Sequence, residues 1–252
     1  MRKKLLFLAF AVITAYMLVG CGKKRELSEC DKMRKSIEEK YGITILYGDD
    51  TVSAEMISNV KLISDKEKIK VLLDQVGEYF SSIPDGFIKE LTSYSKLPVN
   101  ITLVDEKNIG VIFDEEEYWV VNEYDIKSDI ARNMIYSIYW NVNHAENSPG
   151  FLMELHKYNP LDFEYGNMEK CSKYVFNENN HDNTYFINED MMNSFVDEIQ
   201  VLFGLLCDEN TMKAYNVNAL PKIQAKFEYL CSELDRVFET VDENAYWARY
   251  IK

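Results

Sequence analysis

The first eighteen residues constrain the fold most, because they have the pattern of a segment that does not join it. Residues 1–4 carry three positive charges, and residues 5–18 form an apolar run of fourteen residues without a charge. A helix that spans a bilayer needs roughly 20 apolar residues, so this run is short for that role. An apolar core of this length behind a positive start is typical of an export signal. We therefore expect the folded part of the protein to begin later and to lie outside the cytoplasm.

The apolar run ends in Leu18-Val19-Gly20-Cys21, which resembles the lipobox of bacterial lipoprotein signal peptides. The resemblance implies that the Cys21 thiol carries acyl chains such as palmitate, that the chain is cut before it, and that the lipid holds the protein on the cell membrane. We expect residues 1–20 to be a signal peptide, 21–34 a lipidated tether and 35–252 a single domain on the extracytoplasmic face. A short buried helix or an uncleaved anchor is the alternative.

Charge and composition limit the partners of this domain. The chain has 252 residues, 47% of them apolar, which is enough for a packed core and excludes wholesale disorder. It carries 28 basic and 42 acidic residues, a net charge of −14 that repels phosphate backbones, so we expect no nucleic-acid partner. The basic cluster Gly22-Lys23-Lys24-Arg25 sits on anionic headgroups or forms a solvated tether. The expected partners are the membrane, through the lipid, and a peptide, protein or glycan ligand.

Hydrophobic periodicity divides the rest of the chain into helices and strands. Apolar residues three and four positions apart, such as Ile69, Leu72 and Val76, predict helices. Stretches of β-branched and aromatic residues predict strands. The predicted helices cover residues 26–40, 66–80, 87–94, 130–140, 151–158, 193–206 and 220–238. The predicted strands cover residues 43–47, 99–104, 109–113 and 118–122.

The order of these segments predicts one α+β domain with a small, mostly antiparallel sheet followed by a helical C-terminal half. Only a short connection separates the strands at 99–104 and 109–113, which predicts a hairpin. The strand at 118–122 is expected to join the same sheet. The polar, Asn-rich stretch 141–150 is expected to end the helix before it.

Residues that carry common enzyme chemistry are few. The histidines are His144, His156 and His181, and no two lie at the three- or four-residue spacing that places two imidazoles on one helical face. The chain has no GxSxG motif and no Gly-rich phosphate loop. The acidic run 114–117 could hold a hard cation, but it lacks the spacing of an EF-hand, and a solvated hairpin edge is the favoured interpretation.

Four cysteines remain after the lipobox: Cys30, Cys171, Cys207 and Cys231. Disulfides are allowed outside the cytoplasm, but the spacing matches no CxxC pattern. Cys207 and Cys231 lie near the ends of two predicted helices and could pair, and buried free thiols are the alternative. The sequence leaves the disulfide state open.

Several segments, taken together, resemble a family of bacterial lipoproteins with a zinc-dependent metallopeptidase domain of gluzincin-like fold. The similar segments are IEEKYGI at 37–43, LLDQV at 72–76, IPDGFIKEL at 83–91, LPVNITLV at 97–104, YNPLDFEYG at 158–166 and the helix at 220–238. The resemblance covers most of residues 35–240. It implies a domain with a peptidase-like architecture.

In that family, an HExxH helix and a downstream Glu hold zinc, and the Glu within HExxH polarises water. Here Arg132-Asn133-Met134-Ile135-Tyr136 stands in place of HExxH, and Asp197 stands in the place of the third ligand, followed by Glu198. Arginine has no lone pair to donate and asparagine cannot act as the base. The resemblance therefore implies a degenerate metallopeptidase without catalytic residues or zinc. It also suggests that Arg132 pairs with Asp197 where the metal linked the two helices.

Three hypotheses follow. The first is a pseudoenzyme that keeps a peptidase-like domain and binds rather than cleaves. The second is a metallopeptidase with a rearranged site, in which His144 or His156 joins Asp197 or Glu198. The third is an unrelated extracellular binding or scaffold module. In it, aromatic residues of the irregular loop at 161–190 and of the segment just before it would line a groove. Those residues are Tyr158, Phe163, Tyr165, Tyr174, Phe176, Tyr185 and Phe186, for which packing inside the fold is the alternative.

Overall fold

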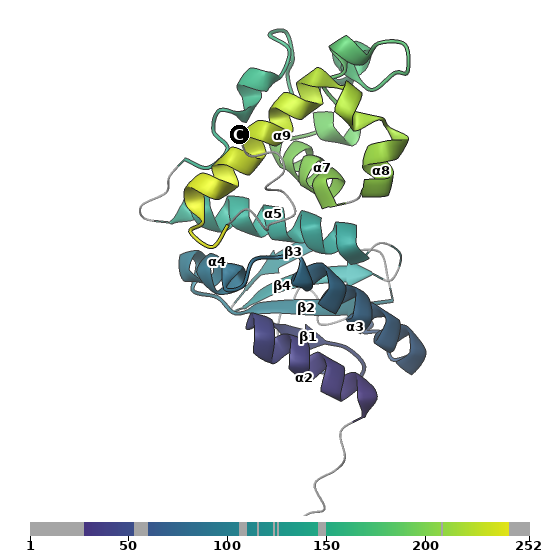
Figure 1. The fold of residues 1–252 in the computed structure, drawn as a ribbon, viewed down its shortest axis with the longest axis vertical. Coiled ribbons are helices and arrows are strands. Elements are labelled where there is room, and N and C mark those ends of the chain that lie inside the picture. The colour runs from purple at the N-terminus through teal and green to yellow at the C-terminus, as the bar shows by residue number, and fades with distance from the viewer. Residues whose placement is uncertain are drawn as a thin grey trace, which may run out of the picture.

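The computed structural model describes residues 28–52, 60–105, 110–114, 116–122, 124, 126–145, 150–207 and 209–241. The expected signal peptide, Cys21 and the basic cluster lie outside them. The fold is α+β, as predicted: a small sheet lies at one end, a group of helices lies at the other, and α5 (Ile126–His144) runs between them (Figure 1). No helix within the described ranges is long and apolar enough to cross a membrane.

Helix α2 (Glu29–Tyr41) confirms the first predicted helix. It begins with a capping box, in which the Ser28 hydroxyl accepts from the backbone N–H of Asp31 and the Asp31 carboxylate accepts from that of Ser28. It ends at Gly42, whose φ of 70° is the left-handed conformation that glycine adopts without strain. Residues 29–34 fall both in the predicted helix at 26–40 and in the expected tether at 21–34, and here they are helical.

Helix α3 (Lys66–Ser81) lies parallel to α2. Cys30 Sγ lies 3.7 Å from the backbone oxygen of Lys66 near the start of both helices, and the Tyr41 and Phe80 rings are 5.3 Å apart near their ends. The apolar stripe predicted for α3 is buried: Ile69, Leu72, Leu73, Val76 and Phe80. The N-termini of the two helices therefore lie close together at one end of the molecule.

The sheet has four strands, and its topology differs from the predicted one. The strands are β1 (Thr44–Leu46), β2 (Val99–Val104), β3 (Gly110–Phe113) and β4 (Glu117–Asn122), in the order β1-β2-β4-β3. β2 pairs in parallel with both β1 and β4, and only β3 and β4 are antiparallel. The predictions of a mostly antiparallel sheet and of a β2–β3 hairpin are therefore wrong. Every residue of β2 is buried, which requires a central strand with neighbours on both sides.

Helix α5 is longer than predicted and connects the two halves of the molecule. Together with α3 and α4 (Phe87–Ser95) it covers one face of the sheet, and its other side packs on the C-terminal helices (Figure 1). The prediction that the polar stretch from Asn141 onwards ends this helix is wrong, because α5 continues to His144. The Asn141 side chain is hydrogen-bonded inside the fold, so it does not compete with the helical backbone.

The C-terminal half contains the two strongly apolar helices that the sequence predicted, α7 (Phe195–Cys207) and α9 (Pro221–Val237). Helix α8 (Glu209–Ala214), which lies between them, was not predicted. Residues 161–190 are irregular with short helical segments, as expected, whereas the helix predicted over residues 151–158 is reduced to a short 3-10 segment at its end. The short segments are η2 (Leu155–Tyr158), α6 (Met168–Cys171), η3 (Ser172–Tyr174), η4 (His181–Asn183) and η5 (Asp190–Met192), and η6 (Val217–Ala219) precedes α9.

Candidate functional site

The two helices that correspond to a metal site pack on each other, but their candidate residues do not meet. α5 and α7 run antiparallel: the Tyr139 and Phe195 rings are 5.3 Å apart, and a Cβ on Gly204 would lie 3.5 Å from Arg132 Nε. Asp197 is seven residues from Gly204, which is about 10 Å along the helix axis. Both residues are described, and no ion pair joins Arg132 to Asp197.

The remaining candidate positions point in other directions. Asp197 Oδ2 accepts a hydrogen bond of 2.6 Å from the Ser194 hydroxyl. This bond lies at the N-terminus of α7. Asn133 is buried and donates to the backbone oxygen of Val120 at 3.0 Å. The Tyr136 ring lies 6.2 Å from that of Phe113 on β3. Among the residues placed by the structure, no group of three His, Cys, Asp or Glu side chains could hold a metal ion.

Glu198, the neighbour of Asp197, is the centre of a buried polar site. Its side chain is 0% exposed and forms an ion pair with Lys226 of α9, which is also 0% exposed, with 2.5 Å between Oε1 and Nζ. The other oxygen, Oε2, accepts from the Tyr165 hydroxyl and, at 3.0 Å, from Asn159 Nδ2. We call Glu198, Lys226, Tyr165 and Asn159 the Glu198 cluster. It joins α7 and α9 to the irregular segment that follows η2.

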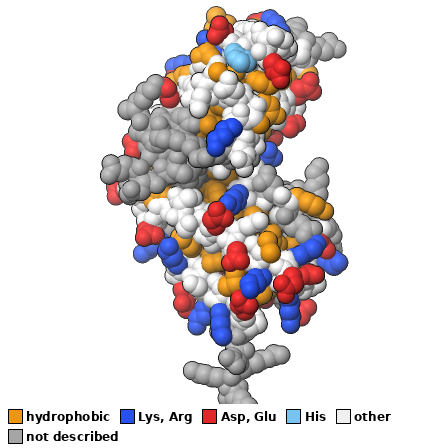
Figure 2. Space-filling model, turned by 45° about the vertical axis from the view of Figure 1, so that its right-hand side comes forward, with side chains coloured by type: hydrophobic (Ala, Val, Ile, Leu, Met, Phe, Trp, Pro, Cys, Tyr) orange, Lys and Arg blue, Asp and Glu red, His pale blue; other side chains and the backbone are white. Residues whose placement is uncertain are grey.

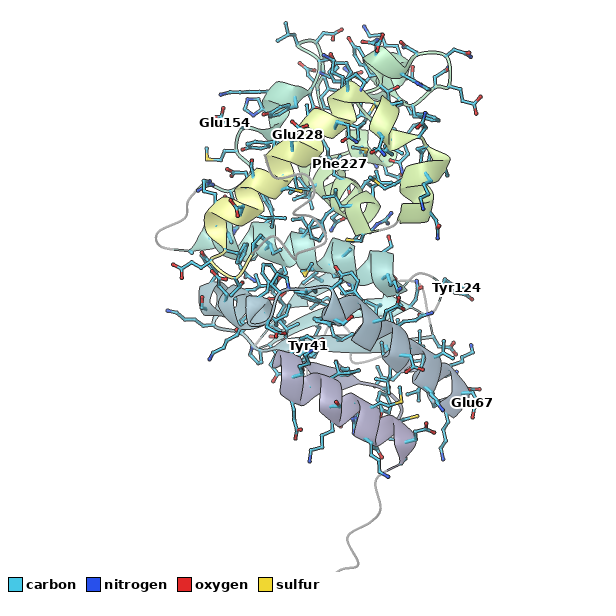
Figure 3. The ribbon with its side chains drawn as sticks, in the orientation of Figure 1. Tyr41, Glu67, Tyr124, Glu154, Phe227 and Glu228 are labelled. Carbon is cyan, nitrogen blue, oxygen red and sulfur yellow. The ribbon has the colours of Figure 1, made fainter. Side chains whose placement is uncertain are left out.

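Lys226 is surrounded by apolar and backbone groups. Its Nζ donates to the backbone oxygen of Tyr185 at 2.7 Å and lies 4.2 Å from the centre of the Phe186 ring. Burial lowers the pKa of Lys226, and the Glu198 carboxylate opposes this shift. Burial, followed by the charge of Glu198, raises the pKa of Tyr165. The cluster lies in the helical half of the molecule, where Figure 3 labels Phe227, the residue after Lys226.

The sequence identified parts of this cluster but not the whole. Asn159 and Tyr165 belong to the YNPLDFEYG segment on which the family resemblance partly rested. Lys226 was missed, although one signal was available: it lies between Ile223 and Leu230 on the apolar face of a helix. Among the aromatic residues around the cluster, Phe186 is fully buried, and the Phe163 ring lies tilted against it with 4.6 Å between ring centres. Tyr158, Tyr174, Phe176 and Tyr185 are partly buried and pack against the core.

A second buried carboxylate lies between the sheet and α5. Glu117 is 0% exposed and accepts from Trp119 Nε1 at 2.6 Å, from Asn141 Nδ2 at 3.0 Å and from Ser137. We call these four residues the Glu117 cluster. Burial raises the pKa of Glu117, and the three hydrogen bonds oppose this shift. The interpretation of the acidic run as a solvated hairpin edge is thus wrong for Glu117, because it faces α5.

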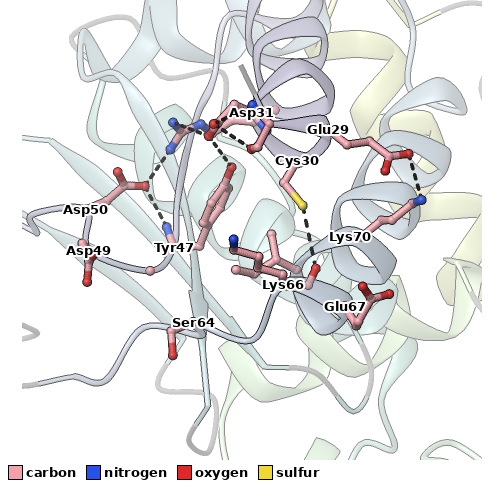
Figure 4. Close-up of a pocket in the computed structure, with 14 residues that line it drawn as sticks. Glu29, Cys30, Asp31, Tyr47, Asp49, Asp50, Ser64, Lys66, Glu67 and Lys70 are labelled. Carbon is pink, nitrogen blue, oxygen red and sulfur yellow. Dashed lines mark hydrogen bonds and ion pairs between the residues drawn. The ribbon is translucent and has the colours of Figure 1, made fainter. Parts of the chain in front are cut away.

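A pocket of about 780 Å³ opens where the N-termini of α2 and α3 meet (Figure 4). Its lining carries both charges: Arg34 is bound to Asp50 at 2.7 Å, and Lys70 to Glu29 at 2.8 Å. Burial raises the pKa of Tyr47, on the pocket wall, to about 12. In the face drawn in Figure 2, acidic and basic side chains are likewise interspersed over the lower part of the molecule. We call this cavity the α2–α3 pocket.

The cysteines and histidines take local roles. None of the described cysteines, Cys30, Cys171, Cys207 and Cys231, forms a disulfide, so the Cys207–Cys231 pair considered above is not present. Cys207 Sγ donates to the backbone oxygen of Phe203 at 3.1 Å. The Nδ1 atoms of His144 and His156 lie within 2.9 Å of the backbone oxygens of Trp140 and Met153, and His181 stacks on Phe176.

No family model, no curated protein and no solved structure matches this chain.

Proposed function

We propose that the protein is a lipid-anchored lipoprotein of the bacterial cell membrane whose extracytoplasmic domain is a pseudoenzyme: it keeps a gluzincin-like, zinc-peptidase-like architecture and binds a ligand rather than cleaving one. The non-catalytic role rests on the contacts of Glu198. This carboxylate follows the position of the third zinc ligand, is 0% exposed, and is bound by Lys226, Tyr165 and Asn159. An active metallopeptidase needs an open coordination position for water, and this arrangement offers none.

The α2–α3 pocket supports the binding role. Its volume of about 780 Å³ lies within the usual range for ligand sites, roughly 300–1,000 Å³. Lys66 and Tyr47 both line the pocket, and so does the carboxylate of Glu67 (Figure 4). A lining with ammonium, guanidinium and carboxylate groups is complementary to a short peptide, which also carries both charges. We therefore assign the pocket to a peptide ligand.

The lipid anchor is tested in a bacterial host that expresses the full chain. We expect the wild-type protein to incorporate labelled palmitate and to remain in the membrane fraction. Cys21→Ser should lose the label and leave that fraction, because the lipobox position no longer carries a thiol to acylate. Cys30→Ser is the matched control and should behave as the wild type. A Cys21→Ser protein that keeps both label and membrane association contradicts the anchor.

The absence of catalysis is tested on the detergent-purified mature protein by elemental analysis after zinc exposure and gel filtration. We expect far less than one zinc ion per chain, since Arg132 and Tyr136 replace two imidazole ligands. Near-stoichiometric zinc that is lost in Asp197→Ala contradicts the pseudoenzyme and calls for a substrate screen.

The binding role is tested by titrating the mature protein with labelled short peptides of mixed charge. Lys66→Ala should weaken binding by about five-fold, the effect of one exposed charge pair. Lys89→Ala, which removes an exposed lysine outside the α2–α3 pocket, is the control. Equal affinities for both variants and the wild type contradict the assignment of this pocket.

A further inference from the structure

The Glu198 cluster brings an amine and a carboxamide to the two oxygens of one carboxylate. Lys226 Nζ donates to Oε1 at 2.5 Å, and Asn159 Nδ2 donates to Oε2 at 3.0 Å. The side chains of Lys226 and Glu198 are both 0% exposed. Glu198 can therefore take a proton from one nitrogen and give it to the other without the involvement of solvent.

The surroundings of Lys226 make its neutral, nucleophilic form easier to reach. The Phe186 ring covers Nζ at 4.2 Å, and the other contacts of Nζ are Glu198 and the backbone oxygen of Tyr185. Burial lowers the pKa of Lys226, so less free energy is needed to remove its proton. A lysine that is desolvated in an apolar pocket is a general form of activated nucleophile.

The carbonyl of Asn159 is the other unusual group. Its Oδ1 atom is buried and has no hydrogen-bond partner, whereas its Nδ2 atom has two, Glu198 and Tyr165. An unsatisfied buried carbonyl is costly, so this side chain gains from another arrangement. Pro160 follows Asn159 and restricts the local backbone, so that rotation of the side chain is the motion available to bring Cγ toward Nζ.

We propose that Lys226 and Asn159 become joined by an intramolecular amide bond, with Glu198 as the acid and base. Glu198 takes one proton from the ammonium of Lys226, and the neutral Nζ attacks Asn159 Cγ. Glu198 then transfers its proton to the leaving Nδ2 and accepts another from Nζ. The C–Nδ2 bond breaks, ammonia leaves, and the products are a secondary amide and a protonated Glu198. No oxidant, cofactor or other enzyme is required.

The Glu117 cluster provides an internal comparison. Asn141 Nδ2 donates to Glu117 Oε2 at 3.0 Å, the same distance as between Asn159 and Glu198. The other partners of Glu117 are Trp119 and Ser137, and none of the contacts in this cluster comes from an amine. Carboxylate and carboxamide are present there without the nucleophile, so the proposal restricts the bond to the Glu198 cluster.

The bond is tested by mass spectrometry of a tryptic digest of the full, mature chain. Cleavage after Lys157, Lys170, Lys222 and Arg236 should release residues 158–170 and 223–236 as one branched species, about 17 Da lighter than the sum of the two peptides. The bond also removes the charge of Lys226, so trypsin should not cut there. The result that overturns the proposal is recovery of 158–170 as a linear peptide together with the separate peptides 223–226 and 227–236.

Three variants and a control test the same bond in a second way. Asn159→Ala, Glu198→Gln and Lys226→Met each remove one participant and should abolish the branched species. Lys222→Met changes a lysine one turn earlier on α9 and should keep the bond to Lys226. The decisive measurement is made on the wild-type protein, so it does not depend on whether the variants fold. A branched species that persists in Glu198→Gln overturns the role of Glu198. The proposed binding function stands or falls separately.

Discussion

Glu117 and Glu198 are both 0% exposed, yet the two halves of the molecule accommodate them differently. In the sheet half, Glu117 is surrounded by neutral donors from Trp119, Asn141 and Ser137. In the helical half, Glu198 has a buried lysine as its partner. A buried carboxyl group can bind a proton more tightly or acquire a counter-ion, and this chain uses both solutions.

The difference has consequences for what each site can do. The Glu117 cluster tolerates protonation, because its pKa is raised and its donors are neutral. The Glu198 cluster depends on Lys226, since removal of one member of a buried ion pair leaves the other charge uncompensated. Of the two clusters, only the Glu198 cluster contains an amine, and the proposed amide bond is therefore restricted to it.

The largest expected effect comes from removal of Lys226. Lys226→Met should lower the free energy of unfolding by about 3–5 kcal/mol, because the buried Glu198 loses its nitrogen partner and the protein loses the proposed amide bond as well. Urea denaturation followed by circular dichroism measures the change. Lys222→Met is the control and should alter stability by less than about 0.5 kcal/mol. A loss below about 1 kcal/mol in Lys226→Met would show that the two clusters do not differ in this way.

A second change on the same background should recover stability. Lys226→Met with Glu198→Leu is expected to be about 2 kcal/mol more stable than Lys226→Met alone, because the unpaired buried carboxylate is gone. Both proteins lack the proposed amide bond, so the comparison isolates the charge. The same urea measurement applies, and equal stabilities would show that water reaches Glu198 in the single variant.

The Glu117 cluster should instead make the free energy of unfolding depend on pH. Burial raises the pKa of Glu117 in the folded state, so the folded state holds this proton more tightly than the unfolded state. The stability that it contributes is fully present below the unfolded pKa and is lost as the pH rises toward the folded pKa. The unfolding free energy of the wild type relative to Glu117→Gln should therefore fall as the pH rises above about 4, the ordinary pKa of a glutamate in the unfolded chain. A difference that is constant with pH would contradict the shift.

The smallest effect is expected between α5 and α7. Arg132 is exposed and lies about two helical turns from Asp197, so a double-mutant cycle of Arg132→Ala and Asp197→Ala should give a coupling energy below about 0.5 kcal/mol. Asp197→Ala alone should cost about 1 kcal/mol, because its carboxylate serves the start of α7 through Ser194. A larger coupling would restore the ion pair suggested by the family resemblance.

Features that depend on neighbouring residues were predicted well. Apolar residues three and four positions apart located α3 and α9, and β-branched stretches located β1 and β2, within one or two residues. These patterns succeed because burial of one helix face repeats with the helical turn. The prediction of a β2–β3 hairpin failed because pairing depends on which strand can be covered on both faces, and that strand is β2.

Polar residues were the hardest to place from local pattern. Asn141 was interpreted as the end of a helix and Glu117 as part of a solvated edge, whereas the fold brings the two together inside. Each is a polar residue in a polar stretch, so the sequence does not indicate that it has a hydrogen-bond partner in a distant segment. Lys226 is the converse case, a charge within an apolar helical face, and such a position does indicate a buried partner.

The sequence by itself determined the positions of the principal helices and strands, and it predicts a lipid anchor at Cys21. Tertiary structure alone decided the order of the strands and the partners of both buried carboxylates. Glu198 bonds to residues 28 positions away at Lys226 and 39 positions away at Asn159. The reason is physical: a helical turn connects residues three or four positions apart, but the cost of a buried charge is met by whichever side chains the packing of distant elements brings beside it.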